Sequence, residues 1–557
     1  MRFLDTSGIR TCFDERVVAK DGIELSLDLY LPVEPGRYPV LLTRTAADNN
    51  RYGRPGISLP PAERWKAIAA QGFIVAAGDV RGRGDSDGQF VPFMQEADDG
   101  VAVLSWLRAL DECNGKVGVF GWGYGAFCAW AAAVADGRID AIASVSPFGA
   151  VGQGLVHRGG AIRLDWLFWM HLIGGRTVQP ANLPPWRRIY RHTPLRTMDD
   201  ALGREDIWWR EWLDHLDPVD PFWAPLDLAG KIATLKVPGL HVTGRWDGQV
   251  SAARYYYEAA SRSGAPQRLI FGPWDTSTVR RPAAQLGGFD FGPRSVIDLD
   301  ETLAQFFEAT LCRDSAAIQA CSRVFITGRN EWGTGEVWCR GVAQSLELHL
   351  GATLGANTRR GDGTLSSAPS ATNGTDVITH NPAAPVDFQP QFSSFAAGAN
   401  PLAFTLDQAH LTGRDEALVY TSEPLDKTVT IVGRPKVRLT VRTAAVDADL
   451  YVLLSDSFPL GIREMHLGHA AIRLATVKAF KSGELNTVEI ELDAIAHDFF
   501  SGHQIRLTIT PSLYPLYARN LQGMHYTTGC EDHTADIELH HGLHVTALLI
   551  LPLLTKE

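Results

Sequence analysis

Residues 117–129 have the sequence Val-Gly-Val-Phe-Gly-Trp-Gly-Tyr-Gly-Ala-Phe-Cys-Ala, and this stretch decides the predicted fold. Residues 117–120 alternate small with β-branched or aromatic side chains, which predicts a buried strand. Glycines at 121, 123 and 125 follow and lead into the Ala-rich residues 126–135, which we predict to be a helix. A strand, a tight turn and a helix in this order place the turn at the carboxyl edge of a parallel sheet, where ligand sites lie.

Two kinds of site use a turn of this shape. A glycine-rich loop binds phosphate, whereas a nucleophile elbow holds a Ser, Cys or Asp in a strained conformation at its tip. The spacing differs from Gly-x-Gly-x-x-Gly, and no Lys-Ser/Thr follows as in a P-loop, so a nucleotide loop is disfavoured. The central residue is Gly123, which has no side chain. The turn is therefore better interpreted as an elbow without its nucleophile.

Length, composition and charge exclude several classes of protein. A chain of 557 residues predicts several domains, and 45% apolar with 21% charged residues is typical of globular proteins. A net charge of −11 argues against a nucleic-acid or anionic-membrane surface. Seven cysteines without paired spacing favour reduced thiols in the cytoplasm and offer no Cys-x-x-Cys metal site. The apolar run at residues 545–554 is well below the ~20 residues of a membrane helix.

The hydropathy pattern divides the chain into three parts. Strand and helix patterns alternate through residues 38–145 and resume at 235–311, which predicts a parallel sheet of βαβ units. The intervening residues are rich in Trp at helical spacing, as in a helical cap over the sheet edge. Later segments are short and alternating, as in a jelly roll. We predict an α/β core at 1–145 and 231–318, a cap at 146–230 and a jelly-roll β-sandwich at 319–557.

This organisation resembles the cocaine esterase and X-prolyl dipeptidyl aminopeptidase family of α/β-hydrolases. Sequence motifs along nearly the whole chain carry the resemblance: Asp21-Gly22, Asp79-Val-Arg-Gly82, Trp246-Asp247-Gly248, Gly272-Pro-Trp274, Asn330-Glu-Trp332 and Tyr517-Ala-Arg-Asn520. The resemblance implies an α/β-hydrolase core with a helical cap and a C-terminal jelly roll. It also implies hydrolysis of esters or amides by a Ser-His-Asp triad, with a Tyr hydroxyl that helps to hold the oxyanion.

The chain departs from the family at the residues that carry the chemistry. The resemblance places the nucleophile at Gly123, the catalytic His at Thr276 and the oxyanion Tyr at Ala47, and only Asp247 matches. Outside the cap, the core up to residue 311 contains one histidine, His241, which lies in a predicted strand and should be packed. We therefore expect no imidazole to act as general base for a hydroxyl nucleophile.

Two carboxylates are catalytic candidates. Asp247 could act as a base on a bound substrate, with its pKa raised by apolar surroundings. The alternative is a structural role, in which it accepts hydrogen bonds from Thr276 or from backbone amides. Asp275 could form a carboxylate pair with Asp247, or it could face solvent from its loop.

A pocket without the Ser, His and Tyr side chains would have room for a bulky, largely apolar small molecule. The predicted binding residues are aromatic or charged side chains near the elbow, in the cap or in the loops after the strands. His171 could equally have a packing role. The set is Trp122, Tyr124, Trp166, Trp169, Trp246, Trp274, Arg44, Asp48 and His171.

Three functions remain open from the sequence. The first is non-hydrolytic chemistry on such a molecule, for example cyclisation, rearrangement, elimination or isomerisation. The second is a pseudoenzyme that binds a ligand or partner, and the third is a residual ester or amide hydrolase. We expect no cofactor and no metal ion, and a homodimer is one open oligomeric state.

Overall fold

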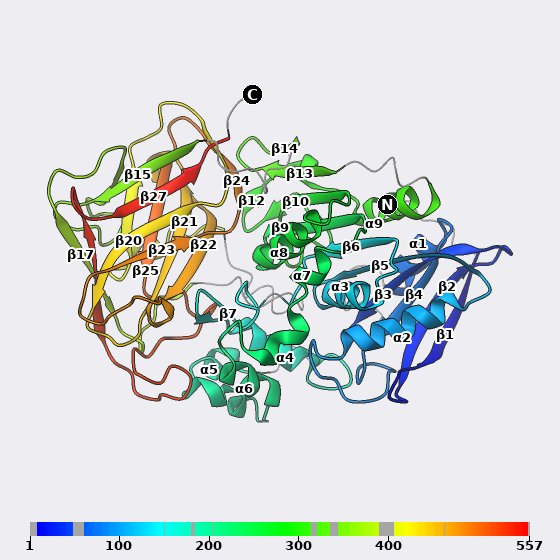
Figure 1. Cartoon of the computed structure of the whole chain (residues 1–557). Coiled ribbons are helices and arrows are strands. Elements are labelled where there is room, and N and C mark those ends of the chain that lie inside the picture. The colour runs from blue at the N-terminus through cyan, green and yellow to red at the C-terminus, as the bar shows by residue number, and fades with distance from the viewer. Residues whose placement is uncertain are drawn as a thin grey trace.

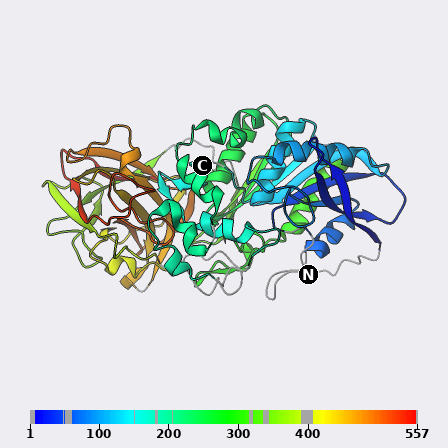
Figure 2. The same cartoon turned by 90° about the horizontal axis from the view of Figure 1, so that it is seen from below.

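The computed structural model describes residues 8–47, 49, 61–149, 151–179, 184–203, 205–313, 320–334, 344–388, 406–461 and 463–554. It has three parts, an α/β core, a mainly helical cap and a C-terminal all-β domain (Figure 1). Seen from below, the molecule is elongated, with the all-β domain at one end and the N-terminal strands at the other (Figure 2).

The core is built on a ten-stranded sheet whose central strands are parallel. Strand order is β1-β2-β4-β3-β5-β6-β9-β10-β13-β14, and only the pairs β1–β2, β2–β4 and β13–β14 are antiparallel. Central strands are buried along nearly their whole length, as expected for a sheet covered on both faces. The strands are β1 Ile9–Val18, β2 Glu24–Pro32, β3 Tyr38–Thr45, β4 Ile74–Asp79, β5 Cys113–Trp122, β6 Ala141–Val145, β9 Gly239–Trp246, β10 Gln267–Asp275, β13 Cys321–Ile326 and β14 Glu331–Thr334.

Helices cover both faces of this sheet, which confirms the predicted α/β core. Helices α1 (Pro61–Ala69) and α9 (Leu299–Phe307) contact each other, as do α2 (Glu96–Arg108) and α3 (Tyr124–Asp136). Helices α7 (Ala229–Ile232) and α8 (Val250–Ser261) lie beyond α3. A Cβ on Gly100 would lie 2.5 Å from the Ala132 Cβ, so glycine allows α2 to approach the Ala-rich α3.

The sheet extends further along the chain than the predicted boundary. Strand β13 pairs in parallel with β10, and β14 returns antiparallel to it. The predicted boundary at 319 assigns both strands to the jelly roll instead. The alternating pattern of β13 fits an added strand at the edge of the core sheet as well as it fits a sandwich strand.

The cap consists mostly of short helices below the sheet in Figure 1. It also contains a small hairpin. The backbone of Arg163 bridges to Tyr517 of the all-β domain and its side chain donates to the carbonyl of Gly248 in the core, so the cap touches both neighbours. The elements are β7 His157–Arg158, β8 Ala161–Ile162, α4 Asp165–Ile173, α5 Trp186–Ile189, η1 Leu195–Leu202, α6 Ile207–Asp214 and η2 Pro221–Leu226.

The C-terminal domain is entirely β, with its own apolar core, which confirms the predicted class. Eleven strands form one sheet, and β19 pairs with β24 separately. The strands are β15 Ser345–Gly351, β16 Thr364–Ser366, β17 Gly374–His380, β18 Leu418–Ser422, β19 Val429–Gly433, β20 Lys436–Thr443, β21 Asp449–Ser457, β22 Glu464–Arg473, β23 Asn486–Glu491, β24 Ile495–Phe499, β25 Gln504–Thr510, β26 Ala535–His541 and β27 Ala547–Pro552. Within the described residues, no helix is both long and apolar enough to span a bilayer.

Candidate functional site

The elbow between β5 and α3 has the geometry that the sequence predicts. Gly123 has φ +55° and ψ −115°, a conformation that strains a residue with a Cβ and that glycine adopts freely. Its N–H donates to the carbonyl of Val145, 2.9 Å away. A Cβ on Gly121 would lie 2.2 Å from the backbone of Gly125, and one on Gly125 would lie 2.6 Å from the carbonyl oxygen of Arg44, so both flanking glycines are needed for the turn to close.

The space beside Gly123 is bordered by a ring and a guanidinium. A Cβ built on Gly123 would lie 3.3 Å from the Phe148 ring and 3.6 Å from Nη2 of Arg280. Among the described residues, apart from the chain neighbours of Gly123 and the backbone of its helix, these groups are the nearest, and neither is a hydroxyl, a thiol or an imidazole. Two residues that the sequence analysis did not select therefore define the tip of the elbow.

The carboxylate of Asp247 lies at the end of β9 and is almost completely buried. Its Oδ2 accepts hydrogen bonds from Thr243 Oγ1 (2.6 Å), Gly244 N (2.9 Å) and Ser146 Oγ (3.0 Å). Its Oδ1 accepts from Gln249 N at 2.6 Å. Burial raises the pKa of Asp247 to about 6, although these donors favour the ionised form.

Asp247 should make the stability of the protein depend on pH. Its folded pKa of about 6 exceeds the ordinary value of 3.8, so the folded state holds this proton up to a higher pH than the unfolded state does. Its contribution to stability is therefore lost as pH rises from about 4 to above 6. We expect the free energy of unfolding of the parent, minus that of Asp247→Asn, to fall by about 2–3 kcal/mol between pH ~4 and pH ~7.

Denaturant unfolding of both proteins at the two pH values measures this difference. Asp275→Asn is the matched control, because the Asp275 carboxylate is only partly buried and its bonds lie within its own turn. A parent-minus-variant difference for Asp247→Asn that does not change with pH would contradict the expectation.

Asp275 and Thr276 are tied into local structure. Asp275 Oδ1 accepts from the amides of Ser277 (3.0 Å) and Thr278 (2.7 Å) and from both hydroxyls, at 2.8 Å each. The Thr276 hydroxyl donates to the backbone carbonyl of Asp247 at 2.5 Å. Within the described residues, no hydrogen bond joins the carboxylate of Asp247 to that of Asp275. Both aspartate side chains thus accept hydrogen bonds that hold their own loops in place.

Both aspartates nevertheless border one small cavity, of about 60 Å³, between the core, the cap and the all-β domain. Arg163 and Asp165 of the cap, which pair with each other, lie in its wall. His466 and His469 of β22 also line it, and burial lowers the pKa of both imidazoles. In the described residues, the hydroxyls of Ser146, Thr243 and Thr276 all donate to Asp247, and none bonds to an imidazole.

The predicted aromatic residues separate into two groups. Tyr124, Trp166 and Trp169 come together in one aromatic cluster that joins the elbow to the cap. Trp169 lies 5.6 Å from both other rings, and Phe148 lies 5.3 Å from Trp166 and 6.0 Å from Trp169. Phe93 extends the cluster, 4.9 Å from the Tyr124 ring.

The remaining predicted tryptophans pack outside this cluster, although Trp246 also lines the small cavity beside Asp247. The indole of Trp246 donates to the carbonyl of His466 at 3.1 Å and stacks on Phe291, in the core of the all-β domain. Trp274 is fully buried and donates to the carbonyl of Ser295 at 3.0 Å. Trp122 is half-buried, packs on Trp65 and Phe120, and carries the Arg64 guanidinium 4.9 Å above its ring.

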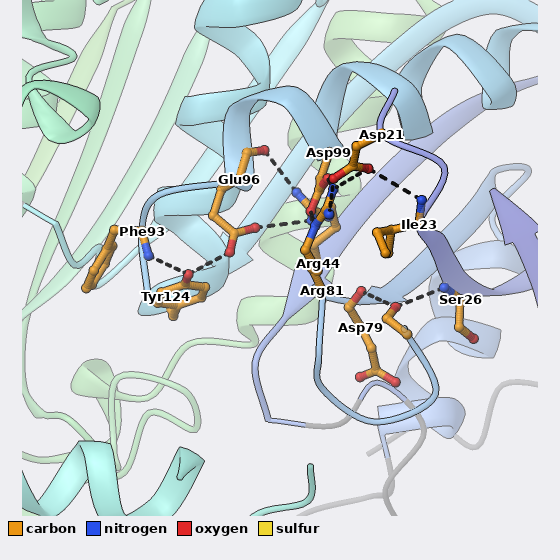
Figure 3. Close-up of polar contacts among 11 residues, drawn as sticks. Asp21, Ile23, Ser26, Arg44, Asp79, Arg81, Phe93, Glu96, Asp99 and Tyr124 are labelled. Carbon is orange, nitrogen blue, oxygen red and sulfur yellow. Dashed lines mark hydrogen bonds and ion pairs between the residues drawn. The ribbon is translucent and has the colours of Figure 1, made fainter. Parts of the chain in front are cut away.

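Arg44 is linked through Glu96 to Tyr124, the residue that follows Gly123 in the elbow (Figure 3). Its Nη2 lies 3.1 Å from Oε2 of the buried Glu96, and its Nη1 donates to the Glu96 carbonyl at 3.0 Å. Glu96 Oε1 accepts the Tyr124 hydroxyl at 2.6 Å, and that hydroxyl oxygen accepts from Phe93 N at 2.9 Å. Burial raises the pKa of Glu96, and the Arg44 charge opposes this shift. Arg44 is thus occupied by an internal ion pair.

The other predicted site residues that the structure describes make packing contacts or local hydrogen bonds. His171 on α4 is half-buried and meets the Trp186 ring edge-on at 5.4 Å. Ala47 is exposed, and its amide donates to Thr45 Oγ1 at 3.0 Å. Asp48 lies outside the described residues. His241 is buried and bonded to Gln267, as expected for a packed core side chain.

Several functional-site neighbours carry no signal in the sequence. Phe148 and Arg280 lie in loops after β6 and β10, where nothing distinguishes them from other loop residues. Ser146 follows the last residue of β6, a place that could have suggested a site residue. Its backbone has φ +49°, which sequence does not reveal.

Comparisons with known proteins agree with this architecture. The profile of the X-Pro dipeptidyl-peptidase (S15) family matches residues 21–277, and that of the X-Pro dipeptidyl-peptidase C-terminal non-catalytic domain matches residues 319–546. Cocaine esterase from Rhodococcus sp. (strain MB1 Bresler) is 30% identical over 97% of this chain and 98% of its own length.

Two solved structures share the fold across whole chains. One is an alpha-amino acid ester hydrolase, with TM-score 0.85 and 23% identity over 100% of this chain and 98% of that one. The other is an aminopeptidase from a marine sediment archaeon, Thaumarchaeota archaeon, with TM-score 0.85 and 21% identity at the same coverage.

Proposed function

The chain belongs to the family of cocaine esterase and the X-Pro dipeptidyl-peptidases, and we propose that this member binds a bulky, largely apolar small molecule at its elbow without hydrolysing it. Acyl transfer needs an attacking atom and a base that takes its proton. The tip of the elbow is Gly123, bordered by Phe148 and Arg280, and this one observation carries the proposal.

The state of the triad acid supports the same conclusion. Asp247 would have to accept a hydrogen bond from an imidazole to take part in a triad. Instead, it accepts from Thr243, Ser146 and two backbone amides. In this proposal the triad is dismantled, and Asp247 holds the loops around the elbow together.

We further propose that any conversion of the ligand is non-hydrolytic. Cyclisation, rearrangement, elimination or isomerisation can be accelerated by orientation and by exclusion of water, without a protein nucleophile. The aromatic cluster of Tyr124, Phe148, Trp166 and Trp169 supplies apolar, rigid surface for such orientation.

A ligand-binding pseudoenzyme is the second candidate, and one observation favours it. Of the two candidate catalytic carboxylates, Asp247 uses both oxygens and Asp275 uses its Oδ1 for internal hydrogen bonds. Neither therefore offers an evident base to a ligand. Incubation of a bound ligand with the protein, followed by mass spectrometry, distinguishes the two candidates, because only the enzyme yields a product.

Covalent labelling tests the loss of hydrolysis. A fluorophosphonate probe reacts with an activated serine, so we expect no labelling of this chain and no turnover of 4-nitrophenyl acetate above the buffer rate. Cocaine esterase serves as the positive control. Labelling of the chain, with loss of labelling on heat denaturation, would restore the residual hydrolase as the function.

A further inference from the structure

Arg280 is the polar group closest to the missing side chain of Gly123. Its Nη2 lies 3.6 Å from the position of a Cβ on that glycine. The residue is exposed to solvent, and no hydrogen bond or ion pair joins its side chain to another described residue. A guanidinium at this place has donors available for a ligand.

The surroundings of Arg280 carry excess positive charge. The charge of a further arginine, Arg64, acts on both Arg280 and Arg281, while the Asp300 carboxylate acts on Arg281 with the opposite sign. Surrounding protein lowers the pKa of Arg280, and the Arg64 charge adds to this shift. Arg64 is paired with Asp300 at 2.9 Å, which leaves Arg280 without a counter-charge among the described residues.

The first turn of α3 adds to the positive potential on the same side of Gly123. The 13-residue helix begins at Tyr124, with no acidic side chain in its first turn and no side-chain cap at Gly123. Unpaired amides at a helix N-terminus stabilise negative charge. An anion beside Gly123 would meet this turn and the Arg280 guanidinium together.

The space beside Gly123 is bordered on another side by an aromatic ring. The Phe148 ring lies 3.3 Å from the position of a Gly123 Cβ and packs edge-on against Trp166 and Trp169 of the cap. An unpaired guanidinium next to an apolar ring is complementary to a ligand that carries one negative charge on an otherwise apolar skeleton. A carboxylate fits this pattern, since arginine binds it through two parallel hydrogen bonds.

We propose that the ligand is an aromatic or otherwise bulky apolar carboxylate, whose anion lies beside Gly123 on Arg280 and whose body lies against Phe148. This inference rests on the proposed ligand-binding function and names the class of ligand. Glycine at 123 is part of the arrangement, because a larger side chain would occupy the place of the anion.

Matched acids and amides test the charge requirement. The probes are 1-naphthoate, 2-naphthoate, 4-phenylbenzoate and indole-3-acetate, each with its primary amide, titrated calorimetrically into the full-length protein. We expect at least one acid to bind about 10-fold or more tightly than its amide, because only the acid forms charge-assisted hydrogen bonds. Its affinity should fall as salt is raised, because the site is open to solvent.

Two neighbouring arginines supply the variant and its control. Arg280→Gln should weaken the acid by about 10- to 100-fold and leave the amide unchanged. Arg281→Gln removes the same charge one residue away and should have less than about a threefold effect. Phe148→Ala should weaken acid and amide alike, since it removes apolar contact. Equal melting temperatures of the arginine variants and the parent show that folding is unaffected.

Each outcome bears on a separate claim. Equal binding of acid and amide, or equal effects of Arg280→Gln and Arg281→Gln, overturns the carboxylate inference and leaves the binding function standing. If no probe of the panel binds, both are overturned. Fluorophosphonate labelling together with the expected acid preference overturns the loss of hydrolysis but supports the anion site.

Discussion

Gly123→Ser is expected to leave ester hydrolysis at the rate of the parent chain, about 10⁶-fold below that of an intact triad. The new hydroxyl would lie beside Phe148 and Arg280, with no imidazole positioned to accept its proton. The rate of 4-nitrophenyl acetate hydrolysis measures this directly, with cocaine esterase as the positive control. A Gly123→Ser protein that approaches the rate of the control would mean that a base is already present.

Restoring three residues together should give a different result. Gly123→Ser with Thr276→His and Ala47→Tyr returns the nucleophile, the base and the hydroxyl that the family resemblance implies. We expect this triple variant to react with a fluorophosphonate and to hydrolyse nitrophenyl acetate at least about 100-fold faster than Gly123→Ser, because general base catalysis contributes 10²–10⁴-fold. Its rate should remain below that of the positive control, because Thr243 and Ser146 already bond to Asp247.

Asp247→Asn in the triple variant is the matched control for a working triad. If the imidazole introduced by Thr276→His uses Asp247, the substitution should return the rate to about that of Gly123→Ser, a loss of about 100-fold or more. If the rate is unchanged, hydrolysis comes from another route. Equal labelling of the triple variant and of the double variant that lacks Thr276→His would likewise contradict the assignment of the base to this position.

The fold was predictable because its signals are repeated along the chain. The buried runs of β4, β6 and β9, each followed by a helix, indicate a parallel sheet whatever the local side chains do. The glycine pattern of the elbow predicts the close approach that Gly121 and Gly125 show. The assignment of β13 was ambiguous, because a short alternating strand fits either sheet.

The site was less predictable because a motif gives the position of a residue but not the direction of its side chain. Trp246 and Trp274 belong to motifs beside the elbow, yet their rings lie in the cores of neighbouring layers. Arg280 and Phe148 belong to no motif, yet they are the closest neighbours of the Gly123 Cβ position. Which loop side chain reaches the elbow depends on tertiary packing, which one sequence does not reveal.

The buried ion pair of Arg44 and Glu96 gives the second large expected effect, on the stability of the fold. Glu96→Gln should lower the free energy of unfolding by about 3–5 kcal/mol, because it leaves the Arg44 charge buried without its main partner. Arg44 is only 3% exposed. The nearest other carboxylate, Asp99, is 3.6 Å from Arg44 and already pairs with Arg81 (Figure 3). Urea unfolding followed by tryptophan fluorescence measures the change in the transition of the α/β core.

Tyr124→Phe is the matched control, since it removes the two hydrogen bonds of one hydroxyl from the same network and leaves the Arg44–Glu96 ion pair in place. It should cost about 1–3 kcal/mol, because the Phe93 amide and Glu96 Oε1 both lose their partner. Equal costs for the two variants would mean that the ion pair contributes no more than a neutral hydrogen bond. A larger cost for Glu96→Gln would show that the buried charges hold α2 and β3 behind the elbow. The shape of the elbow would then depend on Arg44 and Glu96, although no nucleophile remains at its tip for them to position.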